Sequence, residues 1–176
     1  MKWVYTSKSW QIFLILFIPF FLGVFLDLIS KMFSIVINET IMNTIGYVSF
    51  IILFGWLLSL GNLLNKKLPS NVKYSNIFFN VSLTIVILYI ILLDIRSSNE
   101  FLNSLLAPYI YRSFTINMIA MFFMFYAIHF IAKNLVMNER KDKIPFGAHI
   151  QEFFMLWFFP IGIWYLQPRI MRIFNE

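Results

Sequence analysis

The sequence predicts an all-α fold, a polytopic transmembrane helical bundle. Of the 176 residues, 60% are hydrophobic and only 12% are charged, about half the share of charge that soluble domains carry. Four apolar segments approach the roughly 20 residues that a helix needs to cross a bilayer. None of them alternates polar and apolar residues as an outer-membrane strand does. Because backbone polar groups in lipid must be bonded within their own segment, these segments are predicted to be helices.

The predicted spans, in chain order, are residues 10–30, 45–64, 77–95 and 114–132 within a single membrane domain, 1–176. The first follows a basic N-terminal stretch but runs on to Asp27 without a small-residue cleavage site, so we predict a retained span rather than a cleaved signal peptide. This composition excludes a soluble enzyme domain and a disordered regulator. The absence of cysteine excludes a disulfide-stapled module and a Cys-ligated zinc site.

The basic residues are unevenly distributed between the connections. Nine fall on one side of the predicted bundle and three on the other, which predicts a cytoplasmic N-terminus. The nine are Lys2, Lys8, Lys66, Lys67, Lys73, Lys133, Arg140, Lys141 and Lys143, against Lys31, Arg96 and Arg112. Because they do not form a basic stripe, the net charge of +6 predicts anionic lipid headgroups rather than nucleic acid as the partner.

The C-terminal stretch is apolar but short. Phe153 to Leu166 contains fourteen residues, rich in aromatics and interrupted by Pro160 and Gly162. Runs of this length are more often interfacial or re-entrant than spanning. We therefore predict a membrane-dipping segment over about 150–168, ended by Pro168, with a cytoplasmic C-terminus. The alternative is a fifth span with an external C-terminus.

The same stretch carries a resemblance. Phe159, Pro160, Ile161, Gly162, Trp164, Gln167, Pro168, Arg169 and Ile170 form an F-P-I-G-x-W-x-x-Q-P-R-I phrase. It resembles the end of uncharacterised small bacterial multi-span membrane proteins and covers about the last fifth of the chain. The resemblance implies a bacterial cytoplasmic (inner) membrane as the location, and it implies no activity.

Polar residues within spans are costly and are therefore candidates for function. Asp27 and Lys31 have the spacing of an intrahelical ion pair. Asn80, Thr84 and Asp94 lie on one stripe of the third span, which we interpret chiefly as a helix–helix contact. The remaining candidates are Asn117 and His129.

Small residues predict helix packing, and basic residues predict headgroup contact. Gly23, Gly55 and Ser59 lie where close helix approach is expected, within the bundle or between copies. The residues expected to contact lipid headgroups are Lys66, Lys67, Arg140, Lys141, Lys143, Arg169 and Arg172.

One pair of residues has the side chains that an enzyme could use for catalysis. His149 and Glu152 are three residues apart, so on a helix they would be neighbours able to act as a base and its orienting carboxylate. No further metal ligands are evident, and the common hydrolase and phosphate-loop motifs are absent. We therefore expect no metal and no cofactor, and we interpret the pair chiefly as the polar edge of an interfacial helix.

The sequence favours a non-catalytic membrane component: a scaffold, an accessory subunit or an oligomeric effector. Such a protein would associate with itself or with another membrane protein. The alternatives are a small oligomeric transporter or channel, and a lipid-acting membrane enzyme that uses His149 and Glu152.

Overall fold

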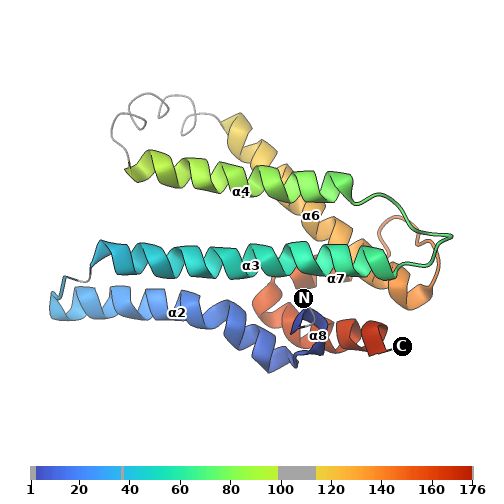
Figure 1. Cartoon of the computed structure of the whole chain (residues 1–176), viewed down its shortest axis with the longest axis horizontal. Helices are drawn as coiled ribbons and strands as arrows, with labels where there is room; N and C mark the ends of the chain where they lie inside the picture. The colour runs from blue at the N-terminus through green and yellow to red at the C-terminus, as the bar shows by residue number, and fades with distance from the viewer. Residues whose placement is uncertain (1–2, 37, 99–113, 176) are drawn as a thin grey trace. The chain divides into compact units, whose positions relative to one another are not determined.

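All regular secondary structure in the described residues is α-helical. The computed structural model describes residues 3–36, 38–98 and 114–175, with the backbone alone for residues 39, 94–98 and 114. The helices are α1 (Trp3–Thr6), α2 (Ser9–Phe33), α3 (Glu39–Lys67), α4 (Ile77–Ser98), α6 (Phe114–Arg140), α7 (Ile150–Trp157) and α8 (Phe159–Asn175) (Figure 1). This confirms the predicted all-α class.

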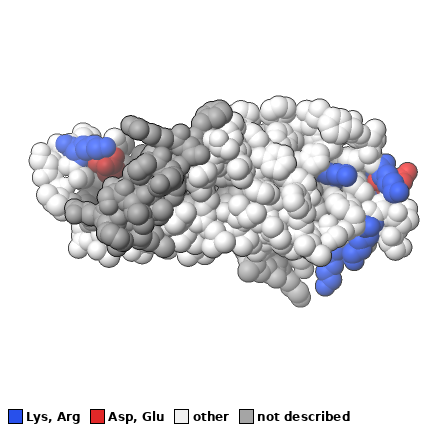
Figure 2. All heavy atoms as spheres, turned by 90° about the horizontal axis from the view of Figure 1, so that it is seen from above, with Lys and Arg blue, Asp and Glu red and all other residues white. Residues whose placement is uncertain are grey.

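Three of these helices are long and apolar enough to cross a membrane: Ser9–Phe33, Thr40–Lys67 and Thr115–Arg140. The described apolar part of α4, Ile77–Leu93, is shorter. Large apolar side chains are widely exposed on these helices: Phe25, Ile51 and Phe122 are 59%, 67% and 60% exposed. Figure 2 accordingly shows broad uncharged areas with few Lys, Arg, Asp or Glu side chains. Such a surface suits the lipid interior and not water.

Two helices extend furthest beyond their predicted spans. α3 begins at Glu39 rather than near 45, and α6 continues past 132 to Arg140. The stretch after 132 is polar, and we expected a connection there. It is helical because Asn134 and Asn138 are fully buried against other helices, where amides find partners within the protein.

The chain forms two compact units. The first comprises Met1–Leu60 and Phe154–Glu176, and the second comprises Gly61–Phe153. In the first unit α8 packs against α1 and α2. Phe17 of α2 stacks on Phe159 of α8, with ring centroids 4.8 Å apart. Pro19 lies inside α2, where it removes a backbone donor, and Figure 1 shows α2 bent in its first half.

The chain makes a sharp corner between α7 and α8. A Cβ at Gly162 would lie 1.8 Å from the backbone oxygen of Met155, whereas seven residues of continuous helix span about 10 Å. Gly162 therefore permits a close approach between the two backbone segments. Pro168 does not end α8. α8 continues through Pro168 to Asn175, held by the buried Ile170 and Ile173.

In the second unit α4 packs alongside α6. The rings of Phe79 and Phe130 stack at 4.5 Å between centroids, and both are almost fully buried. Gly61 lies against this stack, since a Cβ there would come within 2.3 Å of the Phe79 ring. Beyond the helix ends, connections 68–76 and 141–149 share a small apolar cluster. It is formed by Leu68, Val72 and Met137, with Tyr74 and Ile144 packed against it.

Candidate functional site

The structure brings together the two histidines of the chain. His149, immediately before α7, places Nε2 at 2.9 Å from Nδ1 of His129 in α6, with the rings edge to face at 74°. At this distance one ring donates a hydrogen and the other accepts it, so the two facing nitrogens share a single proton. The sequence suggested no such contact, because the residues are twenty positions apart and His129 has no histidine or acid within one turn of its own helix.

The pair lies in a mixed electrostatic environment. Glu152 is in the first turn of α7, where a carboxylate is favourable. Lys133 lies one turn after His129 on α6, and the Tyr126 ring is 6.5 Å from the His129 ring. Burial lowers the pKa of His149 below its ordinary value, and His129 and Lys133 lower it further, while Glu152 opposes them. The neutral imidazole is therefore the favoured form of His149 in the fold.

This lowered pKa predicts a loss of stability in acid. Because the unfolded chain binds a proton at His149 at higher pH than the folded chain does, the free energy of unfolding falls as pH drops below the ordinary histidine pKa. Thermal unfolding of the detergent-solubilised protein between about pH 7.5 and about pH 5.5 measures this effect. His149→Gln should show a shallower pH dependence than the wild type. Equal slopes for the two proteins would contradict the prediction.

The enzyme-like pair is buried. His149 is 4% exposed and Glu152 is 6% exposed. Within the described residues, no three side chains of the types His, Cys, Asp and Glu converge as they would around a metal ion. The arrangement can hold a proton between two rings and fix the start of α7 against α6.

A group of hydrogen-bonded amides joins the C-terminal ends of α3 and α6, which are predicted to lie at the cytoplasmic side. Asn138 Nδ2 donates to Leu64 O, one of the last carbonyls of α3, at 2.8 Å and to Asn134 O at 2.8 Å. The Tyr74 hydroxyl donates to Asn134 Oδ1 at 3.0 Å, and Asn65 Nδ2 donates to Tyr74 O at 3.1 Å. Carbonyls at a helix C-terminus lack partners within the helix, and Asn138 supplies one from outside. The four-residue spacing of Asn134 and Asn138 places both on one face of a helix and could have indicated this contact. The polar character of the stretch led us to predict a connection there.

One residue of the polar stripe of α4, Asn80, bonds to a neighbouring helix. Asn62 Nδ2 of α3 donates to Asn80 Oδ1 at 2.9 Å, and the Thr84 hydroxyl donates to the Asn80 carbonyl at 2.9 Å. Near the other end of α4 the Tyr89 hydroxyl donates to Asn117 Oδ1 of α6. Of the stripe residues, Asn80 therefore bonds to another helix, whereas the Thr84 bond lies within α4 and Tyr89 is not part of the stripe.

The remaining acidic candidates lie toward the opposite ends of their helices. Lys31 Nζ is 2.7 Å from Asp27 Oδ2, which confirms the intrahelical ion pair that the spacing predicts. Both side chains are substantially exposed, at 71% and 48%, and exposed pairs of this kind contribute little to stability. The side chain of Asp94 lies outside the described residues.

The predicted packing glycines are less closely packed than two that we did not select. A Cβ at Gly23 would make an ordinary 3.4 Å contact with Ile45, and a Cβ at Gly55 would meet nothing within 4 Å. Gly61 and Gly162 are the positions where a Cβ would overlap a neighbour. Ser59 is half-buried on α3. Such glycines are identified by a close approach between two segments in the folded chain. The spacing of small residues along one helix does not reveal them.

The predicted headgroup residues lie at helix ends and in a connection. Lys66 and Lys67 end α3, Arg140 ends α6, and all three are exposed. Lys141 and Lys143 follow in connection 141–149 and are exposed too. In α8, Arg172 is exposed in the last turn, and the Arg169 guanidinium lies 5.0 Å from the centre of the Tyr165 ring.

Gln167 is a tail residue whose role the sequence did not reveal. It is fully buried in α8 and donates from Nε2 to Val4 O at 3.0 Å and to Ser7 O at 2.8 Å. One amide thus bonds two carbonyls around the end of α1.

Comparison of the chain with protein-family models, with curated protein sequences and with solved structures finds no match.

Proposed function

We propose that the chain is a non-catalytic integral membrane component, a scaffold or accessory subunit of a bacterial cytoplasmic membrane that associates through its helices. The observation that carries the proposal is that polar residues of the helices are hydrogen-bonded to other parts of the protein. Asn80, Asn117, His129 and His149 are each hydrogen-bonded to a side chain on another element of the described chain. Groups bonded in this way act as contacts between helices. A transport path or a catalytic centre needs some of them to face water or substrate.

The proposal includes four spans: the three long apolar helices and α4, which is the third span in chain order. α4 is 22 residues long, which corresponds to about 33 Å of helix. α7 and α8 have 8 and 17 residues and meet at a sharp corner, and each is shorter than the roughly 20 residues that a span needs. The bonds from Gln167 to Val4 and Ser7 support placing α8 at the same side of the membrane as the N-terminal residues. The basic connections support the cytoplasm as that side.

Association through α3 is the testable part of the proposal. None of the described atoms lies within 4 Å of a Cβ at Gly55, so a neighbouring helix can approach the backbone there without displacing a described side chain. Gly55→Leu fills that space and should weaken self-association in liposomes by about tenfold or more, as one lost close contact costs about 1.4 kcal/mol or more. Single-molecule photobleaching or cross-linking of the reconstituted protein measures it.

The matched control is Gly46→Leu. Gly46 is also in α3 with nothing within 4 Å of a Cβ, and nine residues of separation place it on the opposite face of the helix. Both variants should keep the wild-type melting temperature within a few degrees. A wild-type protein that is monomeric in lipid at every protein density, or equal association of the two variants, would contradict association through the Gly55 face.

A further inference from the structure

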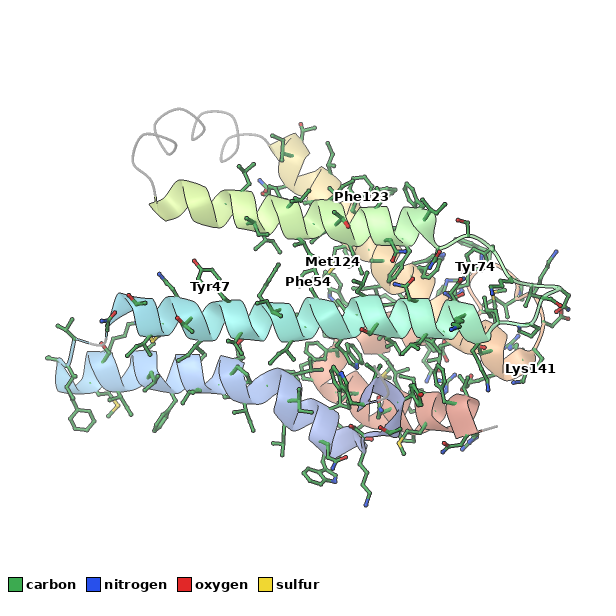
Figure 3. All side chains as sticks on the ribbon, in the orientation of Figure 1. Tyr47, Phe54, Tyr74, Phe123, Met124 and Lys141 are labelled. Atoms are coloured by element: carbon green, nitrogen blue, oxygen red, sulfur yellow. The ribbon has the colours of Figure 1, made fainter. Side chains whose placement is uncertain are left out.

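A basic concavity lies at the end of the second unit where two connections meet. Its volume is about 380 Å³, within the range of about 300–1,000 Å³ that is typical of ligand pockets. Figure 3 shows Tyr74 in the first connection and Lys141 at the start of the second, both at this end of the unit. We call this concavity the basic pocket. Its lining residues are Asn71, Val72, Lys73, Tyr74, Lys133, Met137, Lys143 and Ile144.

The walls of the basic pocket are held by the fold. Val72 and Met137 belong to the apolar cluster that joins the two connections, with Ile144 packed against it. Tyr74 is fixed at both ends, by its hydroxyl bond to Asn134 and by the bond that its carbonyl accepts from Asn65. The Lys133 ammonium lies 5.1 Å from the centre of the Tyr74 ring, in a cation–π contact.

The charge of the basic pocket is all of one sign. Lys73, Lys133 and Lys143 line it and no carboxylate does. None of these three lysines forms a salt bridge within the part of the chain that the structure describes. The nearest acid along the chain, Asp142, accepts the backbone N–H of Lys143 at 2.7 Å. Burial raises the pKa of the Tyr74 phenol, so this side chain stays neutral and adds no negative charge. Three lysines therefore line a space that an anion can enter.

We propose that the basic pocket binds a phosphate group. Phosphate offers several acceptor oxygens and up to two negative charges, and lysines bind it as point charges. Its location, just beyond the ends of α3 and α6, is the level at which basic pockets bind the headgroups of anionic lipids. The phosphate is either that of a phospholipid headgroup or that of a free phosphate ion or ester. This inference does not rest on the proposed function, because it holds for any role of the bundle.

The test measures binding of dioleoyl phosphatidic acid and dioleoyl phosphatidylcholine to the full chain in detergent by native mass spectrometry. The wild type should retain phosphatidic acid in preference to phosphatidylcholine. Lys73→Gln/Lys143→Gln removes two exposed pocket lysines and should weaken phosphatidic acid binding by about tenfold for each charge. Lys66→Gln/Lys67→Gln is the control, because it removes the same charge from exposed lysines at the end of α3 that do not line the pocket. Since these two lysines are themselves predicted to contact headgroups at the surface, this variant should show a smaller loss of binding than the pocket variant.

A competition arm separates the two sources of phosphate. If inorganic phosphate or glycerol 3-phosphate displaces the lipid from the wild type, the pocket accepts free phosphate. If the lipid is retained against both, the pocket binds the phosphate of a lipid headgroup in preference to free phosphate. Equal lipid binding by the pocket variant and the wild type, or an equal loss in the control variant, would overturn the proposal.

A second measurement uses the unaltered protein, so it does not depend on how a variant folds. Acetylation of lysine amines, followed by peptide mass spectrometry, reports the accessibility of each ammonium group. Phosphatidic acid should slow the acetylation of Lys73, Lys133 and Lys143 relative to Lys66 and Lys67. Uniform acetylation rates with and without the lipid would count against the basic pocket as the binding site.

Discussion

Gly162→Ala is expected to destabilise the first unit by at least about 3 kcal/mol, the upper end of the cost of overpacking a core. The added Cβ would lie 1.8 Å from the carbonyl oxygen of Met155 and 2.5 Å from its carbonyl carbon. Both are backbone atoms, so no side-chain rotation can relieve the overlap. The corner between α7 and α8 must open, and with it the packing of Ile163 and Leu166, which are 1% exposed.

Denaturant unfolding in detergent, followed by tryptophan fluorescence, measures this loss, because Trp157 and Trp164 flank the corner. Gly46→Ala is the matched control, since it makes the same change inside a helix where nothing lies within 4 Å. Alanine favours a helix over glycine by about 1 kcal/mol, so this control should be neutral or slightly more stable. Wild-type stability in Gly162→Ala would show that the corner is not as tight as described.

Gln167→Leu is expected to cost about 2 kcal/mol, the penalty for leaving buried carbonyls without a donor. The substitution preserves bulk but removes the Nε2 hydrogens that bond Val4 O and Ser7 O. The cost is held near this value because Gln167 Oε1 is itself buried without a partner, and leucine removes that atom too. Gln167→Glu should be worse, because a carboxylate would face the same two carbonyl oxygens.

Limited proteolysis within residues 1–8 gives a local measurement, since α1 should detach from α8 before the rest of the chain unfolds. Thermal unfolding in detergent gives the global one. Gln151→Leu makes the same replacement at an exposed position of α7, where an effect within about 0.5 kcal/mol is expected. Similar losses for Gln167→Leu and Gln151→Leu would mean that the bond to α1 contributes nothing specific.

The sequence predicted the helices well, because the length of an apolar run is a local property that the bilayer dictates. It failed where a polar residue is buried by another part of the protein. Asn134 and Asn138 looked like a connection and are fully buried helix residues. Hydropathy treats an amide as solvent-exposed, and it cannot register a partner such as the Leu64 carbonyl, 74 positions away.

In the candidate site too, contacts within one helix could be predicted and contacts between elements could not. The pairing of Asp27 with Lys31 was predictable because it lies within one helix. The contact between His129 and His149 was not, since it joins two elements whose packing no single pattern specifies. The glycines show it most clearly. Gly55 has the expected spacing and open surroundings, while Gly162 lies against the backbone of a different helix.

The first unit is built from residues 1–60 together with residues 154–176. During translation α1 and α2 emerge early, but their partner α8 is among the later segments to leave the ribosome. Until then the Val4 and Ser7 carbonyls lack the Gln167 amide and Phe17 lacks Phe159. The first unit therefore cannot assemble until α8 has been synthesised. A chain truncated after residue 153 would keep α1 and α2 without their partner helix.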